Sequence, residues 1–334
     1  MDTKKSSNRT SPVSQAYEAT WLEYIGVVFF LLNLVLFILN CILITMRFIM
    51  VPGSFMHSFL DAIESLFIPA VVVSIATILI NITQYGCPRT GPWLQNVMEA
   101  LFWVYLAISV AASTGMYLIL WSTQVFPIHT MTPVWVFPAY PLLLTASLAT
   151  NLISTDRVGP GDPRSNRIVI AAAAVTVQGT GFLISFMICA AFIYRLMTQK
   201  LPRDMQRPGV FISIGPPAFT VAGAKDIIPP DFAGESHAVV ILEILSTLLG
   251  LWLWGLSEWF FIVSMTWWSF VFPNTALVTA TLALAKALNS SGLRIYACVM
   301  AAALVLVWAL IFGRMLRCLW TRQLLWPKDI DKNG

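Results

Sequence analysis

The amino-acid sequence predicts an all-α polytopic membrane protein, built of helical hairpins whose inner helices are kinked at proline. The first observation is composition: 58% of residues are hydrophobic and 11% charged, with mean hydropathy +0.77. An average soluble domain has about 25% charged residues. The second is a series of apolar runs, each long enough for the roughly 20 residues that a spanning helix needs. The third is that proline interrupts every second run.

We predict nine spans, in one membrane domain over residues 22–320. They are Leu22–Met46, Phe59–Ile82, Trp93–Leu120, Val134–Ser154, Ile168–Met197, Gly209–Ile228, Ala238–Met265, Thr266–Leu288 and Leu293–Leu319. A polar tail (1–21) precedes this domain. The second tail (321–334) is expected in the cytosol, because Lys and Arg are in modest excess on that side. The seventh and eighth spans must meet near Ser264–Trp267 with almost no loop.

Internal prolines occur only in the even-numbered spans. They are Pro69 in the second, Pro138 and Pro141 in the fourth, Pro216 and Pro217 in the sixth, and Pro273 in the eighth. Proline removes a helical hydrogen bond, and a bilayer tolerates that loss where the freed groups face protein or a water-filled cavity. We therefore expect kinked helices in an inner ring and straight helices in an outer shell; the alternative is a chance pattern.

The stretch Arg207–Phe219 is the strongest candidate for a permeation path, because Pro216 and Pro217 break its apolar run. After each break the chain restarts as a half-helix, whose N-terminal amides attract anions. These half-helices therefore predict a permeation path for a small anion. Hydroxyl or amide groups close to the breaks are candidate donors, with ordinary interhelical hydrogen bonds as the alternative; they belong to Ser213, Thr220, Asn274 and Thr275.

Three further side chains are candidates for the path. Arg207 precedes the central broken helix, where it would attract anions or serve as an interfacial anchor. Glu64, with Asp61 one turn earlier, is an acid within a span and hence a functional candidate; we expect it to pair with Arg207 or to bind a coupled proton. Phe272 precedes Pro273 and either closes a narrow pore or packs as most membrane phenylalanines do.

Catalytic and cofactor chemistry has little support. The three histidines, His57, His129 and His237, fall in predicted loops, and the five cysteines form no CxxC pair. No nucleophile-elbow, P-loop or dinucleotide pattern is present. We expect no enzyme activity, no metal or cofactor, no nucleic-acid partner, and cysteines that act as small packing residues.

The segment Arg207-Pro208-Gly209…Gly215-Pro216-Pro217-Ala218-Phe219 resembles a signature of the fungal malate permeases. These belong to the tellurite-resistance/dicarboxylate transporter family, with the plant guard-cell slow anion channels and the fungal sulfite pumps. Further similarities follow in the family's order and cover Leu22 to Pro327. They are Glu64-Ser65-Leu66-Phe67, Pro133-Val134-Trp135…Pro138…Pro141, Gln178-Gly179…Gly181-Phe182, Trp254-Gly255-Leu256 and Phe272-Pro273-Asn274.

The resemblance implies ten helices in five hairpins, with the kinked inner helices around a central pore. It also implies a trimer in which each subunit has its own pore, and Phe272 as the occluding residue. The expected function is transport of malate and other C4-dicarboxylates across the plasma membrane, with proton coupling among the expectations. One alternative is efflux of sulfite or another inorganic anion. Another is a transport-dead membrane subunit, because the family's first inner helix has no counterpart before Leu22.

Overall fold

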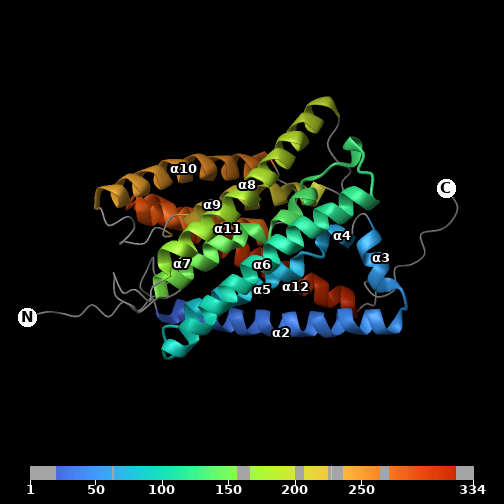
Figure 1. Cartoon of the computed structure of the whole chain (residues 1–334), viewed down its shortest axis with the longest axis horizontal. Coiled ribbons are helices and arrows are strands. Elements are labelled where there is room, and N and C mark those ends of the chain that lie inside the picture. Colours follow the sequence, from blue (N-terminus) through green and yellow to red (C-terminus); the bar gives the residue numbers. More distant parts are fainter. Residues whose placement is uncertain are drawn as a thin grey trace, which may run out of the picture.

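The computed structural model of the chain describes residues 20–61, 64–155, 166–199, 207–224, 227, 236–263 and 271–320 (Figure 1). All regular secondary structure in these ranges is helical, which confirms the all-α prediction. In chain order the elements are α2 (Thr20–Met50), α3 (Ser54–Leu60), α4 (Glu64–Phe67), α5 (Ala70–Asn81), η1 (Ile82–Gly86), α6 (Pro92–Thr123), η2 (Ile128–Thr130), η3 (Pro133–Ala139), η4 (Leu142–Leu144), α7 (Thr145–Thr155), α8 (Arg167–Thr198), η5 (Arg207–Ile214), α9 (Gly215–Ala224), α10 (Ser236–Val263), α11 (Val271–Ala287) and α12 (Ser291–Trp320).

The helices are long and apolar enough for a multi-pass membrane protein. Within the described ranges, six continuous helical stretches pass a length and hydropathy test for membrane crossing. A seventh candidate consists of Pro133–Ala139 and Leu142–Thr155, which meet at a bend of 67°. Each of the nine predicted spans overlaps at least one of the helices. The predicted junction at Ser264–Trp267 lies outside the described residues.

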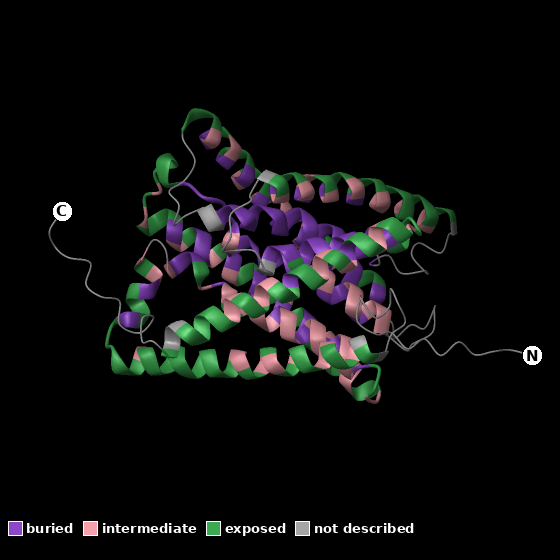
Figure 2. Cartoon of the chain, turned by 180° about the vertical axis from the view of Figure 1, so that it is seen from behind, coloured by how far each residue is buried: buried purple, intermediate pink, exposed green. Residues whose placement is uncertain are grey.

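Four helices form an inner arc, in which α5, α7, α9 and α11 pack against one another in that order. The straight helices lie outside them: α6 covers α5 and α7, α8 covers α7 and α9, and α10 and α12 cover α11. Figure 2 shows buried residues gathered in the centre and exposed residues along the outer helices. The predicted division into broken inner and straight outer helices is therefore confirmed for α5, α7 and α9 and for the straight helices α6, α8, α10 and α12.

The arc is not closed by the elements that the structure describes. α11 and α5 are not among its packed pairs, and α2 lies at the margin with contacts to α3 and α5. Every residue from Ile38 to Arg47 of α2 is exposed. A cavity of about 240 Å³ lies between α2, α11 and α12, with Asn33, Thr275 and Trp308 among its lining residues.

Three of the four predicted breaks occur at their prolines. Pro69 separates α4 from the start of α5, and Pro138 and Pro141 lie in the 3₁₀ segment before α7. Pro216 and Pro217 lie in the first turn of α9, directly after the 3₁₀ segment η5. α11 is described from Val271 onward, and this part has no internal kink. Residues 264–270 lie outside the described residues, so the break predicted at Pro273 stays a prediction.

Several local predictions need correction. His57 lies in α3 and His237 in the first turn of α10, while His129 lies in the short 3₁₀ turn η2, so the histidines are not in irregular loops. Each lies in a short helix or at a helix end, where sequence patterns define boundaries least well. Cys87 and Cys189 are buried, as packing residues would be. Cys41 is exposed, in the stretch of α2 from Ile38 to Arg47 where every residue is exposed.

Candidate functional site

The broken helices η3–α7 and η5–α9 meet in a buried group that we call the kink cluster, consisting of Tyr140, Ile212, Gly215, Pro216, Thr220 and Gln178. Pro216 has no N–H, so the carbonyl four residues earlier, at Ile212, loses its normal helical donor. The Tyr140 hydroxyl donates to that carbonyl oxygen at 2.6 Å. An unpaired buried carbonyl would cost about 1–3 kcal/mol. The tyrosine therefore replaces the hydrogen bond that proline removes.

Gly215 makes room for the tyrosine. A Cβ at this position would lie 2.2 Å from the Tyr140 hydroxyl oxygen, so no larger residue fits without a shift. The Tyr140 ring stacks on Phe137 with centroids 5.1 Å apart and meets Phe219 edge-on at 6.0 Å. The sequence Gly215-Pro216-Pro217 thus breaks the helix at its prolines and, at the glycine, leaves space for the Tyr140 hydroxyl from another segment.

Gln178 of α8 joins the two broken helices. Its Oε1 accepts the Ala146 N–H at 3.3 Å, and its Nε2 donates to Thr220 Oγ1 at 3.2 Å. Ala146 lies in the first turn of α7, where backbone amides lack helical acceptors. One of the amides predicted to face an anion is therefore bound to Gln178 in this conformation.

The two predicted hydroxyl donors of this region also bond to their own helices. Ser213 donates to the Val210 carbonyl at 2.6 Å, and Thr220 donates to the Pro216 carbonyl at 2.8 Å. Each hydroxyl has only one proton, and both side chains are buried. An anion would have to displace these bonds before either hydroxyl could donate to it.

The predicted pore residues divide into two places. Ser213, Pro216, Pro217 and Thr220 lie together in and beside the kink cluster, next to the neighbouring segment that carries Pro138 and Pro141. Asn274 is buried in the first turn of α11, where Pro273 precedes it. Thr275 instead is exposed and lines the cavity beside α2.

Two predicted residues have a described backbone only. Phe272 lies in the first turn of α11, and Arg207 begins η5. Their side chains lie outside the described part of the structure. The gate and the mouth charge assigned to them stay predictions.

The sequence analysis did not predict the tyrosines that donate hydrogen bonds to carbonyls beside the proline breaks. Tyr105 donates to the Pro141 carbonyl at 2.5 Å, and Tyr117 donates to the Trp135 carbonyl at 3.1 Å. Both lie on the straight helix α6 and are buried. The sequence feature that could have identified them is a tyrosine inside an apolar span, because a buried hydroxyl needs a hydrogen-bond partner.

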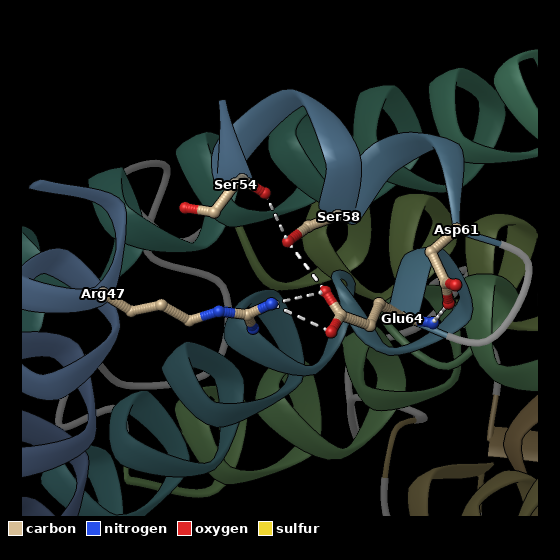
Figure 3. A network of polar contacts seen from close by, with 5 residues as sticks. All are labelled: Arg47, Ser54, Ser58, Asp61 and Glu64. Atoms are coloured by element: carbon tan, nitrogen blue, oxygen red, sulfur yellow. Dashed lines mark hydrogen bonds and ion pairs between the residues drawn. The ribbon is translucent and has the colours of Figure 1, made fainter. Parts of the chain in front are cut away.

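Glu64 lies in a polar network at the end of α2 (Figure 3). Arg47 Nη2 donates to both carboxylate oxygens, at 2.9 and 3.1 Å, and Ser58 Oγ lies 2.8 Å from Oε2. Asp61 Oδ1 accepts the Glu64 N–H at 2.7 Å, which caps the short helix α4. The partner that the structure shows for Glu64 is Arg47, which α2 and the α3–α4 turn bring to the carboxylate; the Arg207 side chain lies outside the described part of the structure, so its expected pairing with Glu64 stays a prediction.

Comparisons with known proteins agree with this architecture. The family model of the SLAC1 voltage-dependent anion channels matches residues 6–316. A malic acid transport protein of Schizosaccharomyces pombe is 27% identical over 93% of this chain and 75% of its own length. A putative malic acid transport protein of the same yeast is 27% identical over 93% of this chain and 77% of its length. A sulfite efflux pump of Trichophyton rubrum is 24% identical, with coverages of 89% and 83%.

The family match covers nearly the whole chain, including every broken helix. It is a family of membrane channels and transporters, not of enzymes. The protein is therefore an anion transporter of the SLAC1 voltage-dependent anion channel family, a multi-pass membrane protein that acts on an anionic substrate.

Proposed function

We propose that the chain carries malate and other C4-dicarboxylates across the plasma membrane. The observation that carries this proposal is the similarity, over 93% of the chain, to two relatives named for malic acid transport. The half-helices α7 and α9 add a physical reason, because each begins inside the bundle, where its N-terminal end favours negative charge.

The proposed path follows the inner arc. Arg207 draws the anion to the start of η5, and the anion then passes the breaks at Pro138, Pro141, Pro216 and Pro217. Ser213 and Thr220 exchange their helical hydrogen bonds for stronger, charge-assisted bonds to the anion. Asn274 and Thr275 act beside Pro273, and Phe272 is the constriction. Each subunit of a homotrimer contains one such path.

Proton coupling belongs to the same proposal, with Glu64 as a mouth residue. Its carboxylate is bound to Arg47 in this conformation, so uptake of a proton there has to compete with the ion pair. In a proton-coupled transport cycle, the Glu64 carboxylate would alternate between the ion pair with Arg47 and a bound proton.

Two other functions have specific support. The similarity to sulfite efflux pumps favours an inorganic anion as the alternative substrate. The gap between α5 and α11 in the described arc favours a transport-dead subunit that acts only with intact relatives. A transport-dead subunit would reach the membrane but would move no anion without an intact relative.

Uptake of labelled malate tests these proposals, in cells without their own dicarboxylate permeases and with surface expression measured. We expect saturable uptake that succinate blocks. Lack of uptake by well-expressed protein would contradict the malate proposal. A change in sulfite tolerance in the same cells would then identify the efflux alternative, and uptake restored only with a co-expressed relative would identify the subunit.

A further inference from the structure

Arg195 is a buried arginine in the last turn of α8, with 4% of its surface exposed. α8 has 32 residues and a rise of about 1.5 Å per residue, so it is longer than the hydrocarbon thickness of about 30 Å. Its last turn therefore lies at the level of the lipid headgroups. This is the end of the bundle where η3 and η5 begin, on the side expected to face the cytosol.

The guanidinium has more donors than acceptors. Of its nitrogens, Nη2 donates to the His129 carbonyl at 2.8 Å. Nε and Nη1 are buried and have no hydrogen-bond partner among the residues that the structure describes, which leaves three N–H bonds unsatisfied there. The two ion pairs of the described residues, Arg47–Glu64 and Arg89–Glu23, lie elsewhere. A buried guanidinium charge is costly without an anion.

The surroundings place this charge beside the proposed path. Phe192, one turn before Arg195 on the same face of α8, packs with Met131 and with Val210 of η5 in one buried cluster. The Val210 carbonyl accepts the Ser213 hydroxyl, at the end of η5 closest to Pro216. The Arg195 side chain therefore stands where the central broken helix begins.

We propose that Arg195 binds the transported anion at this end of the bundle, through the N–H groups of Nε and Nη1. The ligand class is a carboxylate or an inorganic oxyanion, since both present oxygens that accept charge-assisted hydrogen bonds from a guanidinium. The bond to His129 holds the side chain in place and leaves the other donors for the ligand. This inference rests on the proposed function, to which it adds a binding residue.

Anion-dependent thermal unfolding of the purified full-length protein tests the site. Malate, succinate, sulfite and chloride are each titrated against the wild type, R195K, R195Q and the control R89Q. R89Q removes the same charge from an exposed, paired arginine, so general salt effects are equal in the two glutamine variants. A residue that only ties α8 to η2 would lower the starting melting temperature without changing the anion-dependent increase.

We expect a saturable increase in melting temperature with malate or sulfite in the wild type and R89Q. In R195Q the apparent dissociation constant should rise about ten- to hundredfold, and R195K, which keeps the charge but not the planar fork, should lie between. An equal titration in R89Q and R195Q would overturn the site, as would the lack of any saturable increase in the wild type. If R195Q does not fold, R195K against R89Q decides by the same criterion.

The result of the anion titrations tests the Arg195 site separately from the malate proposal. Malate uptake by the wild type together with unchanged titrations in the Arg195 variants would remove the site and leave the function. A sulfite titration that depends on Arg195, in a protein without malate uptake, would keep the site and remove the dicarboxylate function.

Discussion

The Tyr140 hydroxyl oxygen lies 2.6 Å from the Ile212 carbonyl oxygen and supplies the hydrogen bond that Pro216 cannot make. The two residues are 72 positions apart in the chain and belong to different broken helices. Their contact fixes the distance between η5 and the segment before α7. The break at Pro216 is therefore bridged by a buried hydrogen bond from another segment of the chain.

Tyr140→Phe should destabilise the protein by about 1–3 kcal/mol, because it removes only the hydroxyl and leaves the buried Ile212 carbonyl unpaired. The measurement is unfolding of purified protein in detergent. Tyr194→Phe is the matched control, since Tyr194 is 65% exposed. Equal stability of the two variants would show that the Ile212 carbonyl finds another donor.

Gly215→Ala should lower the yield of folded protein, because the new Cβ would lie 2.2 Å from the Tyr140 hydroxyl oxygen. Gly179→Ala is the control, as no atom lies within 4 Å of a Cβ there. The double variant Gly215→Ala/Tyr140→Phe should lose less stability than the sum of its single changes, because the clashing oxygen is absent. Strict additivity would mean that the alanine is opposed by something other than Tyr140.

Phe272→Ala should increase malate flux, or produce a leak, if the ring occludes the path. Flux is compared at equal surface expression with Phe186→Ala, a control on α8 whose side chain is 49% exposed. Equal flux in Phe272→Ala and the wild type would remove the gate assignment.

Glu64→Gln should change stability by about 1 kcal/mol or less, since both partners of the Arg47 pair are partly exposed. It leaves the positive charge of Arg47 unneutralised, so the half-saturating malate concentration should fall by a few fold. Glu23→Gln, which breaks the pair with Arg89, is the control. A rise in that concentration, or an equal fall in Glu23→Gln, would argue against a mouth at Glu64.

Prediction from sequence succeeded best where a single residue determines the outcome. The breaks at Pro69, Pro138 and Pro216 were predictable, because a missing N–H is a property of proline itself. The break at Pro273 stays a prediction, because residues 264–270 lie outside the described part of the structure. The pairing of Glu64 with Arg47 was not predicted, because only the fold brings α2 to the α3–α4 turn.

The donor to the Ile212 carbonyl could not be read from local pattern. Tyr140 stands in a different span, and nothing in either segment specifies the pairing. The same holds for Gln178, which reaches α7 and α9 at once from α8, and for Arg195, which in the sequence is one of several basic residues close to a span end. Burial by neighbouring elements distinguishes it from Arg47 and Arg89.

The sequence by itself determined that this chain is a membrane protein, that proline breaks the helices α5, α7 and α9 at their starts, and that it resembles a family of anion transporters. Each of these follows from the kind and order of residues along the chain. Only the tertiary structure decided which groups satisfy the breaks, which hydroxyl protons are already bound, and which arginine is buried with donors unpaired. These are properties of distance between remote segments, and hydrogen bonds and charge burial depend on distance and direction rather than on order in the chain.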